Sequence, residues 1–198
     1  MNDIVITGLT KSFGNKQVLK DFSMTIPAGG TTCIMAPSGG GKTTLMNLLL
    51  GLISADSGTI QGLEGIRIAA VFQEDRLIET MNPVSNIRLV HPRLSTQTIL
   101  ERMSAVGLNG CAGQPVSELS GGMRRRVALL RALESKWDFL LMDEPFKGLD
   151  PDTLQLVIQE TRRASHHKTV LLITHDLKEA DMMHANLVRL PEIQASNT

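Results

Sequence analysis

The sequence is poor in aromatic residues, carries no net charge and is balanced in its charged side chains. Aromatic residues make up 3% of the 198 residues, and 20 basic residues stand against 20 acidic ones. Single-stranded nucleic acids are commonly bound by aromatic side chains in a basic groove, and DNA-binding domains usually carry a basic excess. The composition therefore argues against a nucleic-acid-binding protein, and we expect no nucleic acid among its partners.

Cysteine is scarce as well. Cys33 and Cys111 are the only two, and neither belongs to a C-x-x-C pair or to a cluster with histidine. This excludes a zinc-finger pattern and a dense disulfide framework, and it fits a reducing, cytoplasmic compartment. Cys33 lies in the apolar run TTCIM, so we expect it to be a small core residue.

Long apolar runs are also missing. A membrane-spanning helix needs about 20 apolar residues, whereas the best run, LMNLLLGLI, is short and contains Asn47. The first residues, MNDIVITG, lack the basic and apolar regions of a signal peptide. Hydrophobic residues still make up 42% of the chain, enough for a sizeable core. We expect a single domain over residues 1–198 that does not itself span a membrane.

What the sequence does contain is an alternation of apolar strands and helical segments. Strands are predicted near the N-terminus, where DFSMTIP alternates, and at TTCIM, IRIAAVFQ, FLLMD, KTVLLITH and LVRLPE. Helices are predicted after the glycine-rich turn, between Leu77 and Ser135, after Asp150-Pro151, and after Asp176, where Glu179 indicates a capping box. The alternation predicts an α/β fold with a mostly parallel sheet covered by helices.

Unusual polar residues follow four of these strands. Lys42 comes after TTCIM and Gln73 after IRIAAVF, Asp143 and Glu144 come after FLLM, and His175 comes after VLLIT. Ligands of open parallel sheets bind at the carboxyl ends of the strands. We therefore expect these five residues to lie at one edge of the sheet.

The stretch APSGGGKTT departs from the phosphate-loop pattern G-x-x-x-x-G-K-[ST] only at Ala36. In such a loop, backbone N–H groups and a helix N-terminus hold phosphate oxygens. Lys42 would reach the β- and γ-phosphates, and the hydroxyl of Thr43 would bind Mg²⁺. An ordinary glycine-rich turn with an exposed lysine is the alternative. The position between a strand and a helix favours the phosphate loop.

Two further motifs add an acidic pair and a second helix N-terminus. In FLLMDEP, Asp143 can hold Mg²⁺ and Glu144 can serve as a general base, although a solvated acidic turn has the same pattern. In LSGGMRRR, Ser120 is expected to cap a helix. The N-terminus of that helix is either an anion site or a simple capped end with a glycine turn. The arginines that follow, 124–126, are expected to form mainly a solvated face.

In their order and spacing these motifs resemble the nucleotide-binding domain of the ATP-binding cassette (ABC) family, over nearly the whole chain. The matching stretches are APSGGGKT, VFQEDRL, LSGGM, FLLMDEP, GLD and LLITHD. The FQEDRL and FKGLDP stretches look most similar to ATPase subunits of nitrate, sulfonate and taurine importers. The resemblance implies a P-loop NTPase core of the RecA-like type, an N-terminal antiparallel β subdomain, and a helical subdomain inserted at about residues 76–135.

The resemblance also implies individual roles. Phe13 matches the aromatic residue that stacks on adenine. The residues that would bind the phosphates are Ser38, Gly39, Gly40, Gly41, Lys42, Thr43 and Thr44. The Mg²⁺ ligands would be Thr43, Gln73 and Asp143, and the catalytic residues would be Glu144, His175, Gln73 and Lys42. Ser120, Gly121 and Gly122 would contact ATP held by a second copy, and Asp150 would shape the contact between the copies.

The implied function is an ATP-binding subunit that hydrolyses MgATP in a head-to-tail dimer and drives solute transport through integral-membrane permease subunits, with import as the expected direction. An extracytoplasmic solute-binding protein would act indirectly, and the subunit would lie on the inner face of the membrane, in the cytoplasm. Residues 73–90 would receive a permease helix, with Leu77, Ile78 and Met81 as an apolar floor, unless these pack inside the helical subdomain.

Two other functions remain as alternatives. One is a soluble family member acting in DNA repair or translation, and the other is a non-hydrolysing ATP-binding regulator. The single cassette without a heptad run argues against the first. The presence of Lys42, Gln73, Asp143, Glu144 and His175 argues against the second.

Overall fold

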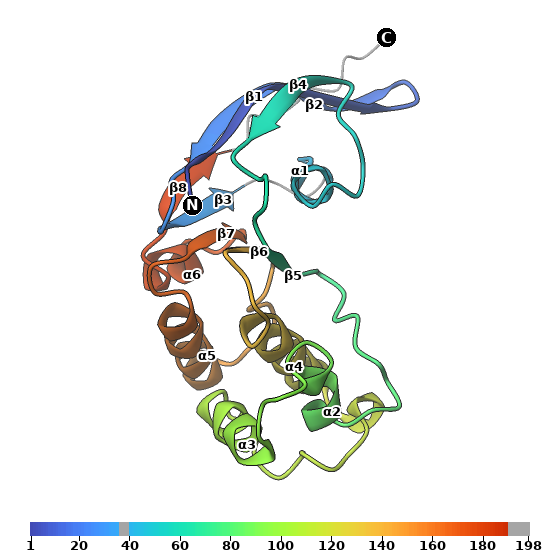
Figure 1. The fold of residues 1–198 in the computed structure, drawn as a ribbon, viewed down its shortest axis with the longest axis vertical. Helices are drawn as coiled ribbons and strands as arrows, with labels where there is room; N and C mark the ends of the chain where they lie inside the picture. Colours follow the sequence, from blue (N-terminus) through green and yellow to red (C-terminus); the bar gives the residue numbers. More distant parts are fainter. Residues whose placement is uncertain (36–39, 190–198) are drawn as a thin grey trace.

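The computed structural model describes residues 1–35 and 40–189, and its upper end is a small antiparallel sheet (Figure 1). The strands are β1 (Ile4–Phe13), β2 (Lys16–Ile26) and β4 (Ser57–Gln61), in the order β2-β1-β4. Ile6 of β1 lies opposite Met24 on one side and Ile60 on the other. The N-terminal antiparallel subdomain is confirmed. β4 was not expected, because Ile60 is its one half-buried apolar residue and no alternation is visible.

The second sheet has five strands and is parallel throughout. Its order is β5 (Ile68–Val71), β6 (Phe139–Asp143), β7 (Thr169–Ile173), β3 (Thr31–Met35) and β8 (Asn186–Arg189). β6 and β7 lie inside the sheet, and every residue of both is buried. This explains why their sequences are continuous apolar runs instead of alternating ones. The predicted α/β fold is confirmed.

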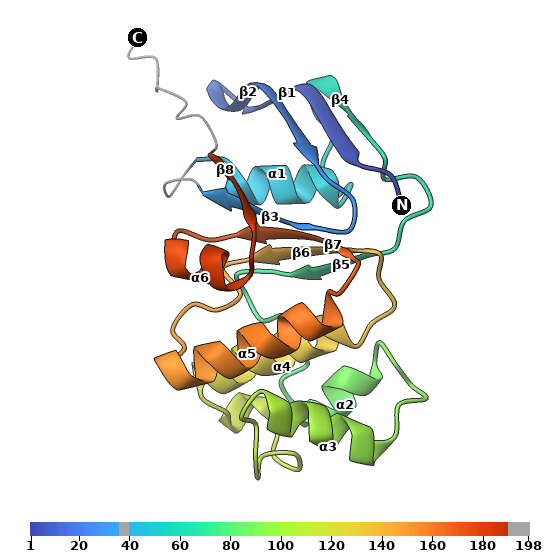
Figure 2. The same ribbon diagram turned by 90° about the vertical axis from the view of Figure 1, so that its left-hand side faces the viewer.

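Helices cover both faces of the parallel sheet (Figure 2). α1 (Lys42–Leu49) lies between the two sheets, and α4 (Gly121–Leu133), α5 (Pro151–Ala164) and α6 (Leu177–Met182) lie on the other side. Successive residues of β6 point to opposite faces, so Leu141 packs in the core around α1 and Leu140 in the core under α4 and α5. Cys33 is a core residue, as expected, and burial raises the pKa of its thiol to about 12.

A helical lobe lies farthest from the antiparallel sheet. It contains α2 (Pro83–Arg88), α3 (Thr96–Ala105), a 3-10 turn (Val116–Glu118) and α4. α2 begins at Pro83 after the Asn82 cap, and α3 begins after the Ser95 cap. Within residues 1–35 and 40–189, no helix has the length and apolar character needed to cross a membrane.

The helix starts expected after the core strands are present, but one cap differs. Asp150 accepts a hydrogen bond from the Thr153 amide at 3.0 Å and Pro151 opens α5, as predicted. Asp176 caps α6 through the Lys178 amide at 2.8 Å. The capping box was wrong, because the carboxylate of Glu179 turns into the core and accepts a hydrogen bond from the Thr174 hydroxyl.

The buried Glu179 carboxyl gives a stability prediction. Burial raises its pKa above the ordinary value, and the Thr174 hydrogen bond opposes this effect only in part. A carboxyl with a raised folded-state pKa makes the protein less stable as pH rises above its unfolded-state pKa. Glu179→Gln keeps an acceptor for Thr174 and removes the charge. The variant should therefore melt at a higher temperature than the parent at pH 8, and the difference should shrink as pH falls toward 5.

Asp138→Asn is the control with the opposite sign. Arg67 donates two hydrogen bonds, at 2.9 and 2.8 Å, to the Asp138 carboxylate and holds its pKa well below the usual range. Removing that charge should lower the melting temperature at neutral pH, and the loss should disappear only in strong acid. A melting temperature of Glu179→Gln that is lowered equally at every pH would contradict the burial argument.

Candidate functional site

The polar residues that follow the strands meet in one cavity at the carboxyl edge of the parallel sheet. The cavity has a volume of about 520 Å³ and is lined by Lys42, Thr43, Gln73, Asp143, Glu144, Lys147 and His175. Gln73 and His175 lie two residues beyond the ends of β5 and β7, and Asp143 is the last residue of β6. The five residues singled out from the sequence are thus brought together.

Gly41 positions the start of α1 at this cavity. Its φ is +80°, a left-handed conformation that side chains rarely adopt, and it is the N-cap of α1. A Cβ atom here would lie 2.9 Å from the Val18 carbonyl oxygen and 2.9 Å from the Leu19 side chain of β2. Glycine therefore allows the chain to pass close to β2 and turn directly into Lys42.

The N-terminus of α1 is suited to an anion. Gly41 has no side chain to cap the helix, and the first turn contains no acidic residue. Free N–H groups and the helix dipole there attract phosphate oxygens. Gly40 and Thr44, on either side of this turn, are half-buried. Ala36, Ser38 and Gly39, which belong to the same predicted loop, lie outside the described residues.

Asp143 is a buried carboxyl at the floor of the cavity. The Thr43 hydroxyl donates a hydrogen bond to its Oδ2 at 3.4 Å. Burial and then the Glu144 charge raise the pKa of Asp143, and Lys42 and Thr43 oppose this rise. A cation would stabilise the ionised carboxylate. A hydroxyl, a carboxylate and the phosphates of a bound nucleotide form a donor set that suits Mg²⁺, and the exposed Gln73 can add an amide oxygen.

Glu144 is held in an unusual backbone conformation. Its φ is +50°, which costs a non-glycine residue roughly 1–2 kcal/mol. Its amide donates to the Ile173 carbonyl at 2.8 Å and so continues the pairing between β6 and β7. Its Oε1 lies 2.9 Å from Nδ1 of His175. The backbone of Glu144 is therefore held by the last residue of β7, and its carboxylate is held by His175, two residues farther along.

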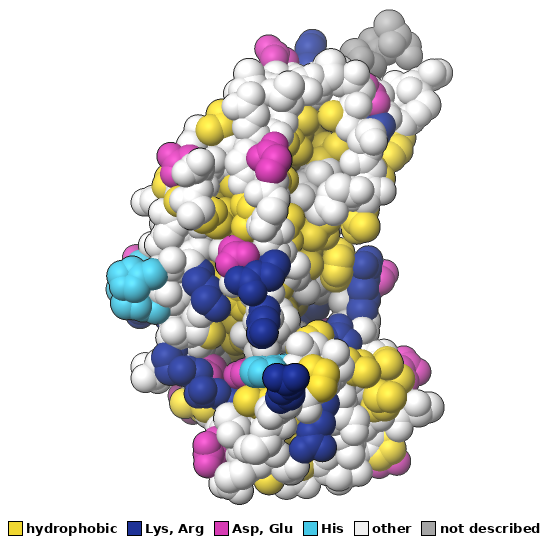
Figure 3. Space-filling model, in the orientation of Figure 1, with side chains coloured by type: hydrophobic (Ala, Val, Ile, Leu, Met, Phe, Trp, Pro, Cys, Tyr) yellow, Lys and Arg dark blue, Asp and Glu magenta, His cyan; other side chains and the backbone are white. Residues whose placement is uncertain are grey.

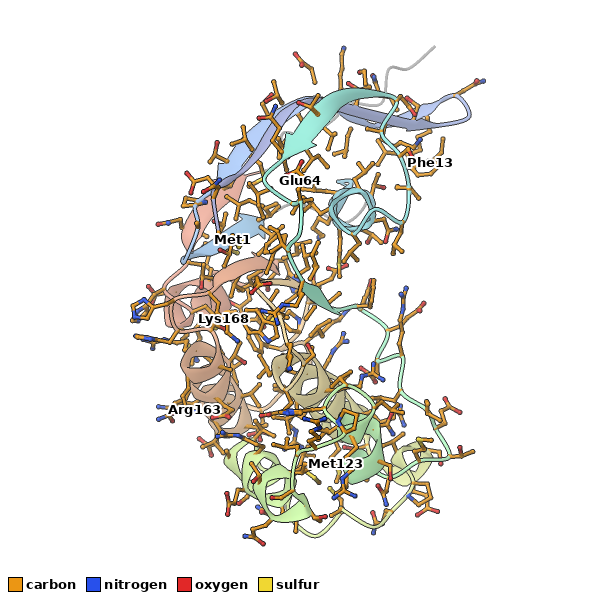
Figure 4. All side chains as sticks on the ribbon, viewed as in Figure 1. Met1, Phe13, Glu64, Met123, Arg163 and Lys168 are labelled. Atoms are coloured by element: carbon orange, nitrogen blue, oxygen red, sulfur yellow. The ribbon has the colours of Figure 1, made fainter. Side chains whose placement is uncertain are left out.

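Seven described residues that were expected at the site do not line this cavity: Gly40, Gly41 and Thr44 adjoin Lys42 and Thr43 along the chain, whereas Phe13, Ser120, Gly121 and Gly122 come from other elements. Phe13 ends β1, is 50% exposed, and has the Lys11 ammonium 5.5 Å from its ring. Ser120, Gly121 and Gly122 begin α4, where the Ser120 hydroxyl accepts from the Met123 amide at 3.2 Å. In Figure 4 Phe13 lies at the upper end of the molecule and Met123 in the helical lobe. The Ser120 cap is present, but this chain does not bring it to its own Lys42.

Lys147 is a cavity residue that was not predicted from the sequence. It is exposed, and its amide donates to the Glu144 carbonyl at 3.4 Å. Its place in the turn directly after the acidic pair was the available signal. It adds a second positive charge beside Asp143 and Glu144.

The solvated face expected for arginines 124–126 was wrong. Arg125 is 7% exposed and donates to the Phe72 and Gln73 carbonyls at 2.6 and 2.7 Å. Arg126 donates to the Val106 and Gly107 carbonyls, each at 2.9 Å. These carbonyls belong to irregular segments next to α4. Because no strand ladder pairs with them, the guanidinium groups supply their hydrogen bonds.

A larger cavity of about 700 Å³ lies at the opposite, amino edge of the sheet. Its lining includes Arg67, Lys136 and Lys168, and Lys168 lies 4.0 Å from the centre of the Trp137 ring. Figure 3 shows Lys and Arg side chains gathered across the middle of the molecule on this view. None of the predicted site residues lines this cavity, and Asp138 already pairs with Arg67. The smaller cavity is therefore the candidate site.

The layered α/β fold, with α1 starting at a cavity that collects Lys42, Thr43 and the acidic pair, defines a P-loop NTPase type of nucleotide-binding protein. The comparisons agree. Residues 19–147 match the family model described as ABC transporter. The chain belongs to the ABC transporter family, as an ATP-binding subunit with ATPase activity.

Several relatives support this membership. The aliphatic sulfonates import ATP-binding protein SsuB 1 of Nocardia farcinica is 41% identical over 182 residues, which cover 89% of this chain and 73% of the relative. The taurine import ATP-binding protein TauB of Shigella dysenteriae is 35% identical over 201 residues, with 93% and 78% covered. A solved structure described as the dimeric structure of MJ0796, a bacterial ABC transporter cassette, matches with a TM-score of 0.81, 26% identity and 94% of each chain covered.

The packing of Gly41 predicts the effect of a single methyl group. Gly41→Ala combines a left-handed φ with a clash against the Val18 carbonyl, so the start of α1 must move. ATP affinity should fall more than about tenfold, because the N–H groups that face phosphate belong to that turn. Isothermal titration with ATP and Mg²⁺ measures this.

Gly65→Ala is the matched control. Gly65 also has a positive φ, +72°, but no atom lies within 4 Å of the position that an alanine Cβ would take. It should lose about 1 kcal/mol of stability and keep parental ATP affinity. Parental ATP affinity in Gly41→Ala would contradict the assigned role of this turn.

Proposed function

We propose that this chain binds MgATP at the carboxyl edge of its parallel sheet and hydrolyses it between two copies of itself, and that hydrolysis drives solute import through a membrane permease. The observation that carries the proposal is the cavity in which Lys42, the Thr43–Asp143 pair and the Glu144–His175 pair lie together. Phosphate binding, charge neutralisation and activation of water all require such groups within a few ångströms of each other.

The binding roles follow from position. Lys42 at the start of α1 neutralises the β- and γ-phosphates, whose oxygens also accept hydrogen bonds from the backbone around Gly40, Gly41 and Thr44. The sequence motif assigns the same role to Ser38 and Gly39. Thr43, Asp143 and Gln73 would hold Mg²⁺, which would offset the negative charge of the phosphates. Phe13 stacks on the adenine ring, for which its half-exposed aromatic face is available.

Glu144 and His175 carry the chemistry at the γ-phosphate. The Glu144 carboxylate accepts the proton of the attacking water, while His175 holds the carboxylate through Nδ1 and contacts the γ-phosphate. Lys42 stabilises the charge that develops on the transferred phosphoryl group, and Gln73 orients the water. The left-handed turn at Glu144 aims the carboxylate into the cavity and away from the sheet.

A second copy completes each site. The capped N-terminus of α4, Ser120–Gly122, does not line the cavity of its own chain, and Ser120 is exposed. A head-to-tail dimer places it on the γ-phosphate held by the partner, where its N–H groups bind oxygen. The solved cassette to which this chain is similar is described as dimeric, which supports a dimer here. Asp150, at the start of α5, lies at the contact between the copies.

The relatives and two exposed apolar side chains support import, a permease partner and a location at the membrane. The names of the relatives specify import of aliphatic sulfonates and of taurine, and we infer the same class of transport here, at the cytoplasmic face of the membrane, with a solute-binding protein acting indirectly. Leu77 packs into the core and Met81 is half-buried, whereas Ile78 is 41% exposed and Leu89 49% exposed. Ile78 and Leu89 offer the apolar surface to a permease helix.

Glu144→Gln separates binding from hydrolysis. Glutamine keeps the size of the side chain but is a very poor base, so hydrolysis should fall by roughly 10²–10⁴-fold while ATP affinity stays near the parental value. Lys42→Ala should instead lose ATP affinity as well as activity. Phosphate release and ATP titration on the purified chain measure both quantities. Parental hydrolysis by Glu144→Gln would rule out the general-base role.

Mixing two inactive variants tests the shared site. Lys42→Ala removes the phosphate contact of one chain, and Ser120→Asp keeps a helix cap while it places a negative charge against the partner's phosphate. In a mixed dimer one site contains an intact Lys42 and an intact Ser120. Activity of the mixture should therefore exceed the sum of the two variants, and the parental rate should rise faster than linearly with protein concentration. A linear dependence together with no recovery on mixing would exclude the shared site.

A further inference from the structure

The segment that follows β5 is attached to α4. Arg125, five residues into α4 from its Ser120 cap, is 7% exposed. Its Nη1 donates to the Phe72 carbonyl at 2.6 Å and to Oδ1 of Asp75 at 3.2 Å, and its Nη2 donates to the Gln73 carbonyl at 2.7 Å. One guanidinium thus contacts three of the four residues between Phe72 and Asp75.

Other polar contacts hold the same segment to the helical lobe. Arg131 of α4 donates to the Asp75 carbonyl at 3.3 Å, and Nε of Arg124 lies 3.8 Å from the Asp75 carboxylate. Farther along, the buried Asn86 of α2 accepts from the Ile78 amide at 2.9 Å and donates to the Ile78 carbonyl at 3.1 Å. The segment from Phe72 to Ile78 is therefore tied to α4 and α2 on its polar side.

The backbone and the side chain of Gln73 have different surroundings. Its carbonyl is bound by Arg125, while its side chain is exposed and lines the cavity that also contains Asp143 and Glu144. A planar guanidinium that donates to two neighbouring carbonyls fixes the orientation of both peptide groups as well as their distance from it. Here the two peptide groups flank the Cα atom of Gln73. The orientation of the Gln73 side chain consequently depends on a residue that does not itself line the cavity.

We propose that Arg125 is a positioning residue for hydrolysis. It orients the Gln73 side chain toward the reacting phosphate and connects the Gln73 backbone to α4, the helix that Ser120 caps. Ser120 and Arg125 are about 7.5 Å apart along one helix, at 1.5 Å per residue. This inference rests on the proposed function, because it needs Gln73 and Ser120 to face nucleotide.

A double-mutant cycle tests the proposal on the purified chain. Arg125→Gln should lower kcat by between about tenfold and a hundredfold, the effect of an ångström-scale misplacement of a catalytic group. KM for ATP should change by less than about twofold, because the phosphate contacts proposed for Gly41 and Lys42 lie at the start of α1 and not on the segment that Arg125 holds. In a Gln73→Ala background, Arg125→Gln should lower kcat no further, since its effect acts through Gln73.

Arg126→Gln is the matched control. Arg126 is also partly buried on α4 and donates to two carbonyls at 2.9 Å, but these belong to Val106 and Gly107. Both arginine variants should lower the melting temperature. Only the Arg125 effect on kcat should disappear in the Gln73→Ala background, whereas the effect of Arg126→Gln should multiply with that of Gln73→Ala.

Arg125→Lys covers the case in which glutamine prevents folding. Lysine keeps the charge beside Asp75 and reaches one carbonyl, but it cannot form the planar fork, so kcat should lie between the parental and Arg125→Gln values. Multiplicative effects of either Arg125 variant with Gln73→Ala would overturn the inference and leave the proposed function intact. A parental kcat for Gln73→Ala alone would overturn both this inference and the proposed role of Gln73, and Glu144→Gln would then test the remaining site independently.

Discussion

Parallel pairing of β3, β6 and β7 is the constraint on which the rest of the molecule depends. Ile34 lies opposite Ile173, and Ile173 lies opposite Asp143, so the three strands end at the same level. The Glu144 amide adds one more hydrogen bond to Ile173 before the chain leaves the sheet. Asp143, Glu144 and His175 are positioned from these strand ends, and a shift of one residue would turn Asp143 toward the other face.

The cavity brings two carboxyl groups, those of Asp143 and Glu144, close together. Asp143 is buried next to Glu144, and its pKa is raised in spite of Lys42 and Thr43. In the proposed function a cation would relieve the repulsion between these two carboxyl groups, and phosphate oxygens would face Lys42 and Lys147. Ligand binding and stability are therefore linked, because a ligand that binds only the folded state stabilises it.

Arginine side chains of α4 bind the backbone of the irregular segments that pack against this helix. Arg125 binds the carbonyls after β5, and Arg126 binds those after α3. Buried guanidinium groups suit this task because each offers several donors in a fixed plane to irregular backbone. Ser120 caps the same helix, so the residues that bind these carbonyls and the end of α4 that is proposed to face phosphate belong to one helix.

Local pattern was enough to predict much of this protein. Apolar runs located β3, β6 and β7, and the phosphate-loop motif and the acidic pair marked the cavity. The caps at Asp150 and Ser120 were predictable for the same reason, since a cap bonds an amide three residues away.

Only the tertiary structure decided which side chains meet across long distances in the chain. Arg125 finds the Phe72 carbonyl 53 residues earlier, and nothing in LSGGMRRR distinguishes it from an exposed arginine. Glu179 turns from the predicted capping box to Thr174 because β7 ends beside α6, and β4 forms because β1 offers it an edge. The sequence determined elements and motifs, which depend on neighbouring residues. The fold determined the partners of buried polar groups, because those partners come from whichever segment packs against them.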